Sequence, residues 1–168
     1  KIDAVNYFTY LVSNVSRETV SQTRQYLLNS LEMVWWKFFS TDQRKANSKK
    51  LENKISDLFY SPLIKDDERK PLFWSFTRVA LTDEAQNMVY KVWSNQTGIK
   101  GIKFDESDYM VLACELAVRD FKNGDSILYA QEKRIENTDR LAKFRFIKRA
   151  VTSAVAVRDS FFVSLSYS

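Results

Sequence analysis

The sequence contains no histidine and a single cysteine among its 168 residues. Without histidine there can be no Ser–His or Cys–His pair to activate a nucleophile, and the commonest metal ligand is missing. One cysteine cannot form a disulfide within the chain. Cys114 lies in the apolar stretch 109–118, so we expect it to be a small buried hydrophobic residue. No recognisable active site is present.

Glycine and proline are also scarce, with 3 and 2 residues. Turns and strand-rich sandwiches consume both residue types, so their scarcity favours long helices joined by short polar loops. Hydrophobic residues make up 45% of the chain and aromatic residues 14%, which argues against disorder. No apolar run approaches the roughly 20 residues needed to span a bilayer, so we expect no membrane partner.

The net charge of +5 comes from 26 basic and 21 acidic residues mixed along the chain. Mixed charge is typical of solvated helix faces, so we do not expect nucleic acid as a partner. The chain starts at Lys1 without an initiator methionine or a signal peptide. We therefore expect residues 1–168 to be a piece of a longer protein.

Apolar residues recur at helical spacing along the chain and predict about nine helices and no strand. Ser16 is predicted to cap a helix that runs to about Phe39. Ser40 and Gln43 form an S-x-x-Q capping box that predicts the start of the next helix. Thr82 is predicted to cap a later one.

Several of these helices are apolar on two sides, as expected when each layer packs between neighbours. The predicted fold is all-α, a single superhelical solenoid of antiparallel helix pairs over residues 1–168, similar to HEAT and armadillo arrays. The tetrapeptide Ala-Val-Arg-Asp at 117–120 recurs at 156–159, a separation close to the period of two-helix repeats. This recurrence predicts equivalent positions in two repeats.

Three segments near the C-terminus carry a family resemblance. They are RIENTDR at 134–140, KFRFI at 143–147 and VRDSFFVSL at 157–165. Together they resemble the C-terminal helical domain of zinc aminopeptidases of the aminopeptidase N family, and the bacterial members above all. The family pattern there is approximately R-I-x-N-P-D-R, then R-F-x-F followed by P-A-L-S, then V-R-D-x-F-F-x-S-L. Thr138 and Arg149 stand where that pattern has proline.

The resemblance implies a parent enzyme that removes N-terminal residues from peptides. Such enzymes hold zinc with an H-E-x-x-H helix and a downstream glutamate, and bind the substrate amine with a G-x-M-E-N loop. This chain contains neither motif, so we expect it to be non-catalytic and without a cofactor, with zinc in the parent catalytic domain. The implied partners are that N-terminal catalytic domain and a peptide substrate. The implied location is the bacterial cytoplasm or cell envelope, including the periplasm.

In this family the helical domain walls the peptide-binding cavity, which suggests a role for one basic face. At about 100° per residue, Arg145, Lys148 and Arg149 fall on one side of the helix predicted at 139–152. We expect this face to bind the C-terminal carboxylate of a peptide, because arginine can hold a carboxylate through two hydrogen bonds. The alternative is a solvated face, or ion pairs with acidic neighbours.

Two other functions remain open from the residues alone. One is a free-standing helical-repeat module that binds a protein or peptide in its groove. The other is a basic solenoid that binds nucleic acid. The pairs Arg119–Asp120 and Arg158–Asp159 are expected to make structural bonds rather than to act in catalysis, and Trp35 and Trp93 to lie in the core.

Overall fold

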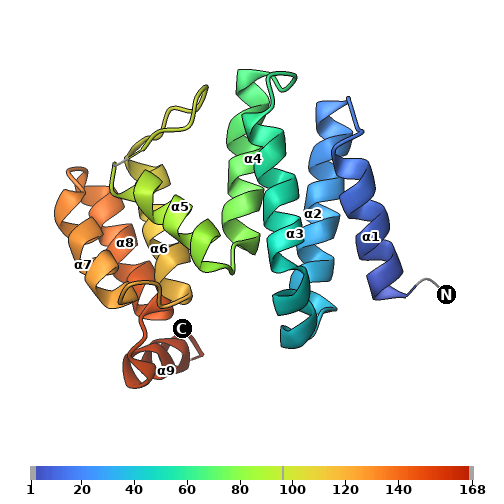
Figure 1. Ribbon diagram of the computed structural model, residues 1–168. Helices are drawn as coiled ribbons and strands as arrows, with labels where there is room; N and C mark the ends of the chain where they lie inside the picture. The colour runs from blue at the N-terminus through green and yellow to red at the C-terminus, as the bar shows by residue number, and fades with distance from the viewer. Residues whose placement is uncertain (1–2, 96, 167–168) are drawn as a thin grey trace. The chain divides into compact units, whose positions relative to one another are not determined.

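The computed structural model describes residues 3–95 and 97–166, and in these ranges the chain is all-helical, without a strand. The helices are α1 (Ala4–Val15), α2 (Ser21–Lys37), α3 (Thr41–Tyr60), α4 (Asp66–Val79), α5 (Asp83–Trp93), α6 (Glu106–Val118), α7 (Gly124–Arg134), α8 (Thr138–Val151) and α9 (Val155–Leu165) (Figure 1). None of these helices is both long and apolar enough to cross a membrane.

The described residues form two compact units. The first contains the chain up to Ala85 together with Gly98–Ile102, and the second contains Gln86–Thr97 and the chain from Lys103 onward. The all-α prediction is confirmed. The single domain and the solenoid stay predictions.

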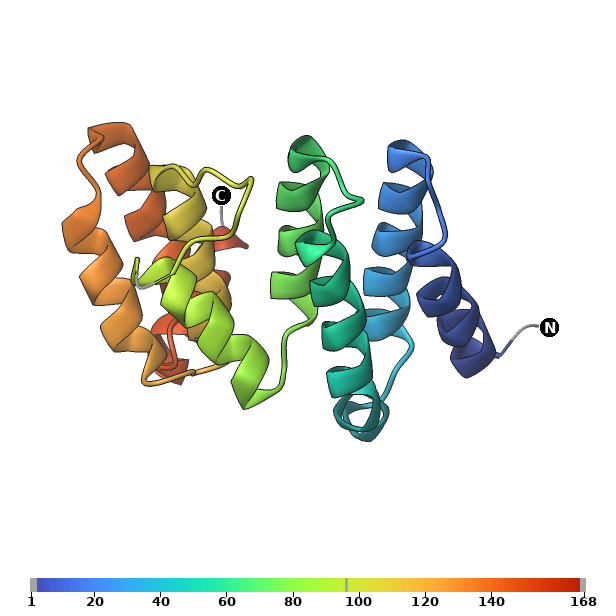
Figure 2. The same ribbon diagram turned by 45° about the horizontal axis from the view of Figure 1, so that its top comes forward.

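The first unit is built from two antiparallel helix pairs, α1 with α2 and α3 with α4, and α2 also packs on α4 (Figures 1 and 2). Two clusters of aromatic rings fill its interior. Phe8, Trp35 and Phe39 form the first, with the Phe8 and Phe39 ring centroids 4.8 Å apart. Phe59, Phe73 and Phe76 form the second. Trp35 is fully buried, as predicted.

The starts of α2 and α3 test two sequence predictions. The capping box is confirmed: the Ser40 hydroxyl accepts from the Gln43 backbone N–H, and the Gln43 side chain accepts from the Ser40 N–H. The prediction for Ser16 is wrong, because Ser16 ends α1 and α2 begins at Ser21. The Glu18 carboxylate accepts the Val20 N–H at 2.7 Å and holds the residues between these helices in a turn.

Arg69 of α4 is a buried hub that fixes the connection between α3 and α4. Its guanidinium donates to the backbone carbonyls of three residues: Phe59, Ser61 (3.0 Å) and Ile64 (2.8 Å). Its Nε donates to Asp66 at 3.0 Å. The C-terminal carbonyls of a helix lack intrahelical partners. Arg69 supplies a donor to one of them, at Phe59, and to two carbonyls of the residues that follow α3.

A buried carboxylate of α3 fixes the start of α5. Glu52 accepts the backbone N–H groups of Leu81 (2.6 Å) and Thr82 (2.9 Å) and the Thr82 hydroxyl. The same hydroxyl accepts the Ala85 N–H at 3.2 Å, which confirms Thr82 as the cap. A negative charge at a helix start is favourable because the N-terminal end of the helix dipole is positive.

In the second unit, α6 packs on α7 and α8, and α7 packs on α8. The contact between α6 and α7 is close: a methyl group added at Gly124 would lie 2.6 Å from the Ala117 Cα. Trp93 is buried and donates its ring N–H to the buried Gln131 side chain at 2.8 Å. The core prediction for Trp93 is therefore confirmed.

The two Ala-Val-Arg-Asp segments do not occupy equivalent positions. Residues 117–120 lie at the C-terminal end of α6 and in the turn after it, whereas 156–159 lie in the first turn of α9. The prediction that they mark a structural repeat is wrong.

Candidate functional site

The three cations predicted to bind a carboxylate lie on α8, and two of them already have an acidic partner. Arg145 Nε donates to one oxygen of Glu132 on α7 at 2.7 Å, and the Lys148 ammonium donates to the other. Hydrogen bonds from Lys148, and then from Arg145, lower the pKa of Glu132 below its ordinary value. The charges of this pair are therefore partly neutralised within the second unit.

Arg149 is placed differently. Its guanidinium lies over the ring of Phe161 on α9, 5.2 Å from the ring centroid, and the side chain is exposed. Among residues 3–95 and 97–166, no carboxylate lies within ion-pair distance of it. Of the three predicted cations, Arg149 is the one whose charge is available to a ligand.

A cavity of about 260 Å³ brings Lys148 and Arg149 to the same opening. It lies between α7, α8 and α9, and its wall is completed by Asp125, Leu128, Tyr129, Thr152 and Val157. The wall combines apolar side chains with two cations and the Asp125 carboxylate, and Arg149 is the cation there without an ion pair among the described residues.

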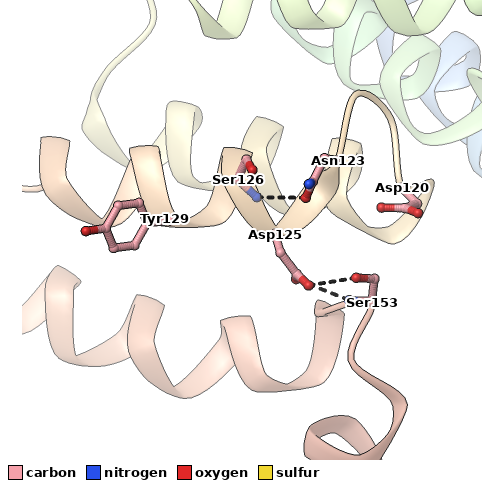
Figure 3. Close-up of a pocket in the computed structure, with 6 residues that line it drawn as sticks. All are labelled: Asp120, Asn123, Asp125, Ser126, Tyr129 and Ser153. Atoms are coloured by element: carbon pink, nitrogen blue, oxygen red, sulfur yellow. Dashed lines mark hydrogen bonds between the residues drawn. The ribbon is translucent and has the colours of Figure 1, made fainter.

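A second, polar hollow of about 710 Å³ surrounds the start of α7, with Asp120, Asn123, Asp125, Ser126, Tyr129 and Ser153 around it (Figure 3). Asp125 accepts from the Thr152 hydroxyl at 2.7 Å, and from both the hydroxyl (2.6 Å) and the backbone N–H (3.2 Å) of Ser153. These bonds, led by the Ser153 hydroxyl, lower the pKa of Asp125. Sequence reasoning missed this contact, because the partners are 27 and 28 residues away.

Two other polar side chains of this hollow bind backbone N–H groups at the start of α7. Asp120 accepts the Gly124 N–H and Asn123 accepts the Ser126 N–H. Asp120, Lys122 and Asn123 all have left-handed backbone conformations, with φ between 48° and 63°. Such conformations are unfavourable for residues with a side chain, and these two hydrogen bonds help to hold the turn. Asp120, Asn123 and Asp125 thus each have a structural role here.

Cys114 is half-buried, and burial raises the pKa of its thiol to about 12. A thiol that stays protonated is a poor nucleophile. Within the part of the chain that the structure describes, no three acidic or cysteine side chains gather in a way that could hold a metal ion. With no histidine in the sequence, these residues do not fit a catalytic zinc site.

Most residues that carry the family resemblance have structural contacts. Arg134 donates to the Trp93 carbonyl at 2.9 Å and covers the rings of Trp93 and Tyr109. Asn137 caps α8 by accepting the Arg140 N–H at 2.9 Å.

Some of the other motif residues follow the same pattern, whereas Phe146, Phe162 and Leu165 are about half exposed. Phe144 and Phe161 are buried. Arg158 donates to the Thr152 carbonyl, and Arg119 donates to the carboxylate and carbonyl of Glu115. The structural interpretation of the two arginines is confirmed.

Comparisons with protein-family models, with curated proteins and with solved structures found no match for this chain. A function for it therefore depends on its own residues and their geometry.

Proposed function

We propose that this chain is the non-catalytic C-terminal helical domain of a zinc metallo-aminopeptidase of the aminopeptidase N family. In this proposal its helix pairs are layers of a solenoid similar to HEAT and armadillo arrays, and they wall the cavity that receives the peptide. The zinc would belong to the catalytic domain of the parent, where it would activate the water that attacks the scissile carbonyl. The partners of this chain are then that domain and the peptide.

The observation that carries the proposal is the role of the motif residues. Arg134, Asn137, Phe144 and Phe161 stand at helix junctions or in the core of the second unit. Residues at such positions determine how helices pack, so a motif made of them indicates a fold and not a reaction. This supports a relationship between helical domains.

The decisive experiment is to sequence the coding region upstream of Lys1. The proposal expects an H-E-x-x-H segment followed by a glutamate a few hundred residues earlier, and a G-x-M-E-N segment before it. A start codon next to Lys1 would contradict it. That result would favour the free-standing module that binds a protein or peptide.

Within this proposal, Arg145, Lys148 and Arg149 bind the C-terminal carboxylate of the peptide, and Arg149 contributes most because it has no ion pair among the described residues. In the full enzyme, Arg149→Ala should raise KM for free-acid peptides and leave KM for amide-capped peptides almost unchanged. Arg145→Ala should have the same selectivity with a smaller effect. Equal effects on both peptide classes would exclude the carboxylate site.

Nucleic-acid binding is the third alternative. Phosphate contacts give affinities that fall steeply with salt. A DNA titration of residues 1–168 at two salt concentrations therefore tests it, and we expect no salt-sensitive binding.

A further inference from the structure

The turn between α6 and α7 contains the sequence's one Asn-Gly pair, Asn123–Gly124. Asparagine is thermolabile, and most of all before glycine, because glycine has no side chain to hinder the approach of its backbone nitrogen to the asparagine side chain. The Asn123 side chain is exposed beside the polar hollow at the start of α7, where water reaches it (Figure 3). The pair therefore has the chemistry of a modification site.

The modification needs only the chain and water. The Gly124 backbone nitrogen attacks the side-chain carbonyl carbon of Asn123 and loses its proton as the new C–N bond forms, and the side-chain amide leaves as ammonia. Water then opens the resulting succinimide ring. Opening at the side-chain carbonyl gives aspartate. Opening at the main-chain carbonyl gives isoaspartate, in which the main chain runs through the former side chain.

In the folded turn both reacting groups are held by other bonds. The Gly124 N–H donates to the Asp120 carboxylate at 3.1 Å, and the Asn123 side-chain oxygen accepts the Ser126 N–H at 3.2 Å. Gly124 is buried against α6, where an added methyl group would lie 2.6 Å from the Ala117 Cα. Ring closure removes the proton that binds Asp120 and moves the cap of α7, so the turn has to open first.

Asp120 is the residue that holds this turn closed. Its carboxylate binds the start of α7, and its own backbone N–H donates to the Ala117 carbonyl of α6 at 2.9 Å. The turn that it closes contains left-handed residues, Asp120 (φ 49°), Lys122 (φ 48°) and Asn123 (φ 63°). Such conformations persist only where surrounding contacts hold them, so loss of the Asp120 bond should favour opening.

We propose that Asn123–Gly124 is a site of spontaneous deamidation, and that the Asp120 bond limits its rate by holding the α6–α7 turn closed. Isoaspartate adds an atom to the main chain where Gly124 and Ala117 are already in close contact, so the modified turn cannot close as before. The modification is independent of the peptidase proposal. A start codon next to Lys1 would remove that proposal and leave this one intact.

The chain supplies an internal control for the chemistry. Asn137 caps α8 as Asn123 caps α7, but Thr138 follows it, and a branched side chain hinders ring closure. Residues 1–168 are incubated at mildly alkaline pH with and without urea, and the digested chain is analysed by mass spectrometry. Enzymatic methylation of the isoaspartyl carboxylate identifies that product. In urea we expect Asn123 to be converted while Asn137 stays intact.

Without urea, Asn123 should be converted slowly, and hydrogen exchange at the Gly124 and Ser126 amides should report the same rare opening. Asp120→Ala should speed the conversion about tenfold, equivalent to about 1.4 kcal/mol in the opening equilibrium. Asp120→Asn keeps an acceptor for the Gly124 N–H and should retain most of the protection. Asp139→Ala removes an exposed carboxylate at the start of α8 and is the matched control, which should change nothing.

Four outcomes would overturn the proposal. Intact Asn123 in urea would remove the site, and equal conversion with and without urea would remove the protection by the fold. A rate in Asp120→Ala no higher than in Asp139→Ala would remove the role of the bond. A lower rate would mean that the carboxylate helps to remove the Gly124 proton.

Should Asp120→Ala fail to fold, as judged by circular dichroism, the unaltered chain decides. Below the urea concentrations that unfold it, conversion of Asn123 should rise in parallel with hydrogen exchange at the Gly124 amide. Conversion that rises only with global unfolding would refute the role of turn opening.

Discussion

Replacing Arg69 by methionine should destabilise the first unit strongly. The substitution keeps a long apolar side chain but removes every donor from the α3–α4 connection. The backbone carbonyls of Phe59, Ser61 and Ile64 then lose their side-chain partner, and two of these bonds are fully buried.

Each buried polar group left without a partner costs about 1–3 kcal/mol. The connection can relax and admit water at Ser61, whose bond is only partly buried. We therefore expect a loss of about 2–6 kcal/mol in the free energy of unfolding, from the two buried carbonyls that lose their partner. Arg69→Lys keeps the charge but not the planar fork of donors. It should retain part of the stability.

Urea unfolding followed by circular dichroism measures the change, and hydrogen exchange at residues 61–65 shows whether it starts at this connection. Arg17→Met is the matched control, because Arg17 is exposed in the turn between α1 and α2. A change below about 1 kcal/mol for Arg69→Met, within the range of an ordinary surface substitution, would refute the assignment of Arg69 as a hub.

Three further predictions concern the second unit. Gly124→Ala should lower the free energy of unfolding by about 1–3 kcal/mol, because the added methyl group would overlap the α6 backbone. Gly98→Ala is the control: its methyl group meets nothing within 4 Å, so the melting temperature should not change. Equal melting temperatures of the two variants would contradict the prediction. The lowered pKa of Glu132 contributes stability that is present above the ordinary value of 4.5 and is lost as pH falls through the folded value. When the urea midpoint of unfolding is measured against pH, it should therefore fall less on the acid side in Glu132→Gln than in the unaltered chain. The same fall in both would argue against the Lys148 and Arg145 bonds. Cys114 in the folded chain should resist iodoacetamide at neutral pH, with its thiol pKa near 12, and should react once urea restores the ordinary value of 9.0; rapid alkylation of the folded chain would contradict the burial.

Local sequence signals predicted the helices well. Ser40 and Gln43 are three residues apart, so their capping box depends on nothing outside the segment. The prediction for Ser16 was wrong because residues that cap the start of a helix also occur at helix ends. Only the bond from the Val20 N–H to Glu18 shows that Ser16 ends one helix rather than starting the next. The Ala-Val-Arg-Asp recurrence failed because four residues do not determine whether a helix begins or ends.

The surface chemistry was much less predictable. The positions of Arg145 and Lys148 on one helix face follow from helical periodicity. Their neutralisation by Glu132 does not, because that residue comes from another helix, 13 and 16 residues earlier. Likewise, Met33 and Trp36 are apolar residues of α2, and both are more than 40% exposed. Periodicity identifies an apolar face but not what covers it.

The Asp125 contacts have a consequence for the direction of the last helix. The bonds from Thr152 and Ser153 fasten the end of α8 and the turn before α9 to the start of α7. One carboxylate thus holds the connection that leads into α9 against the start of α7. A change that removed these bonds, such as Asp125→Ala, should release this connection from α7, while the packing of α7 and α9 on α8 remains.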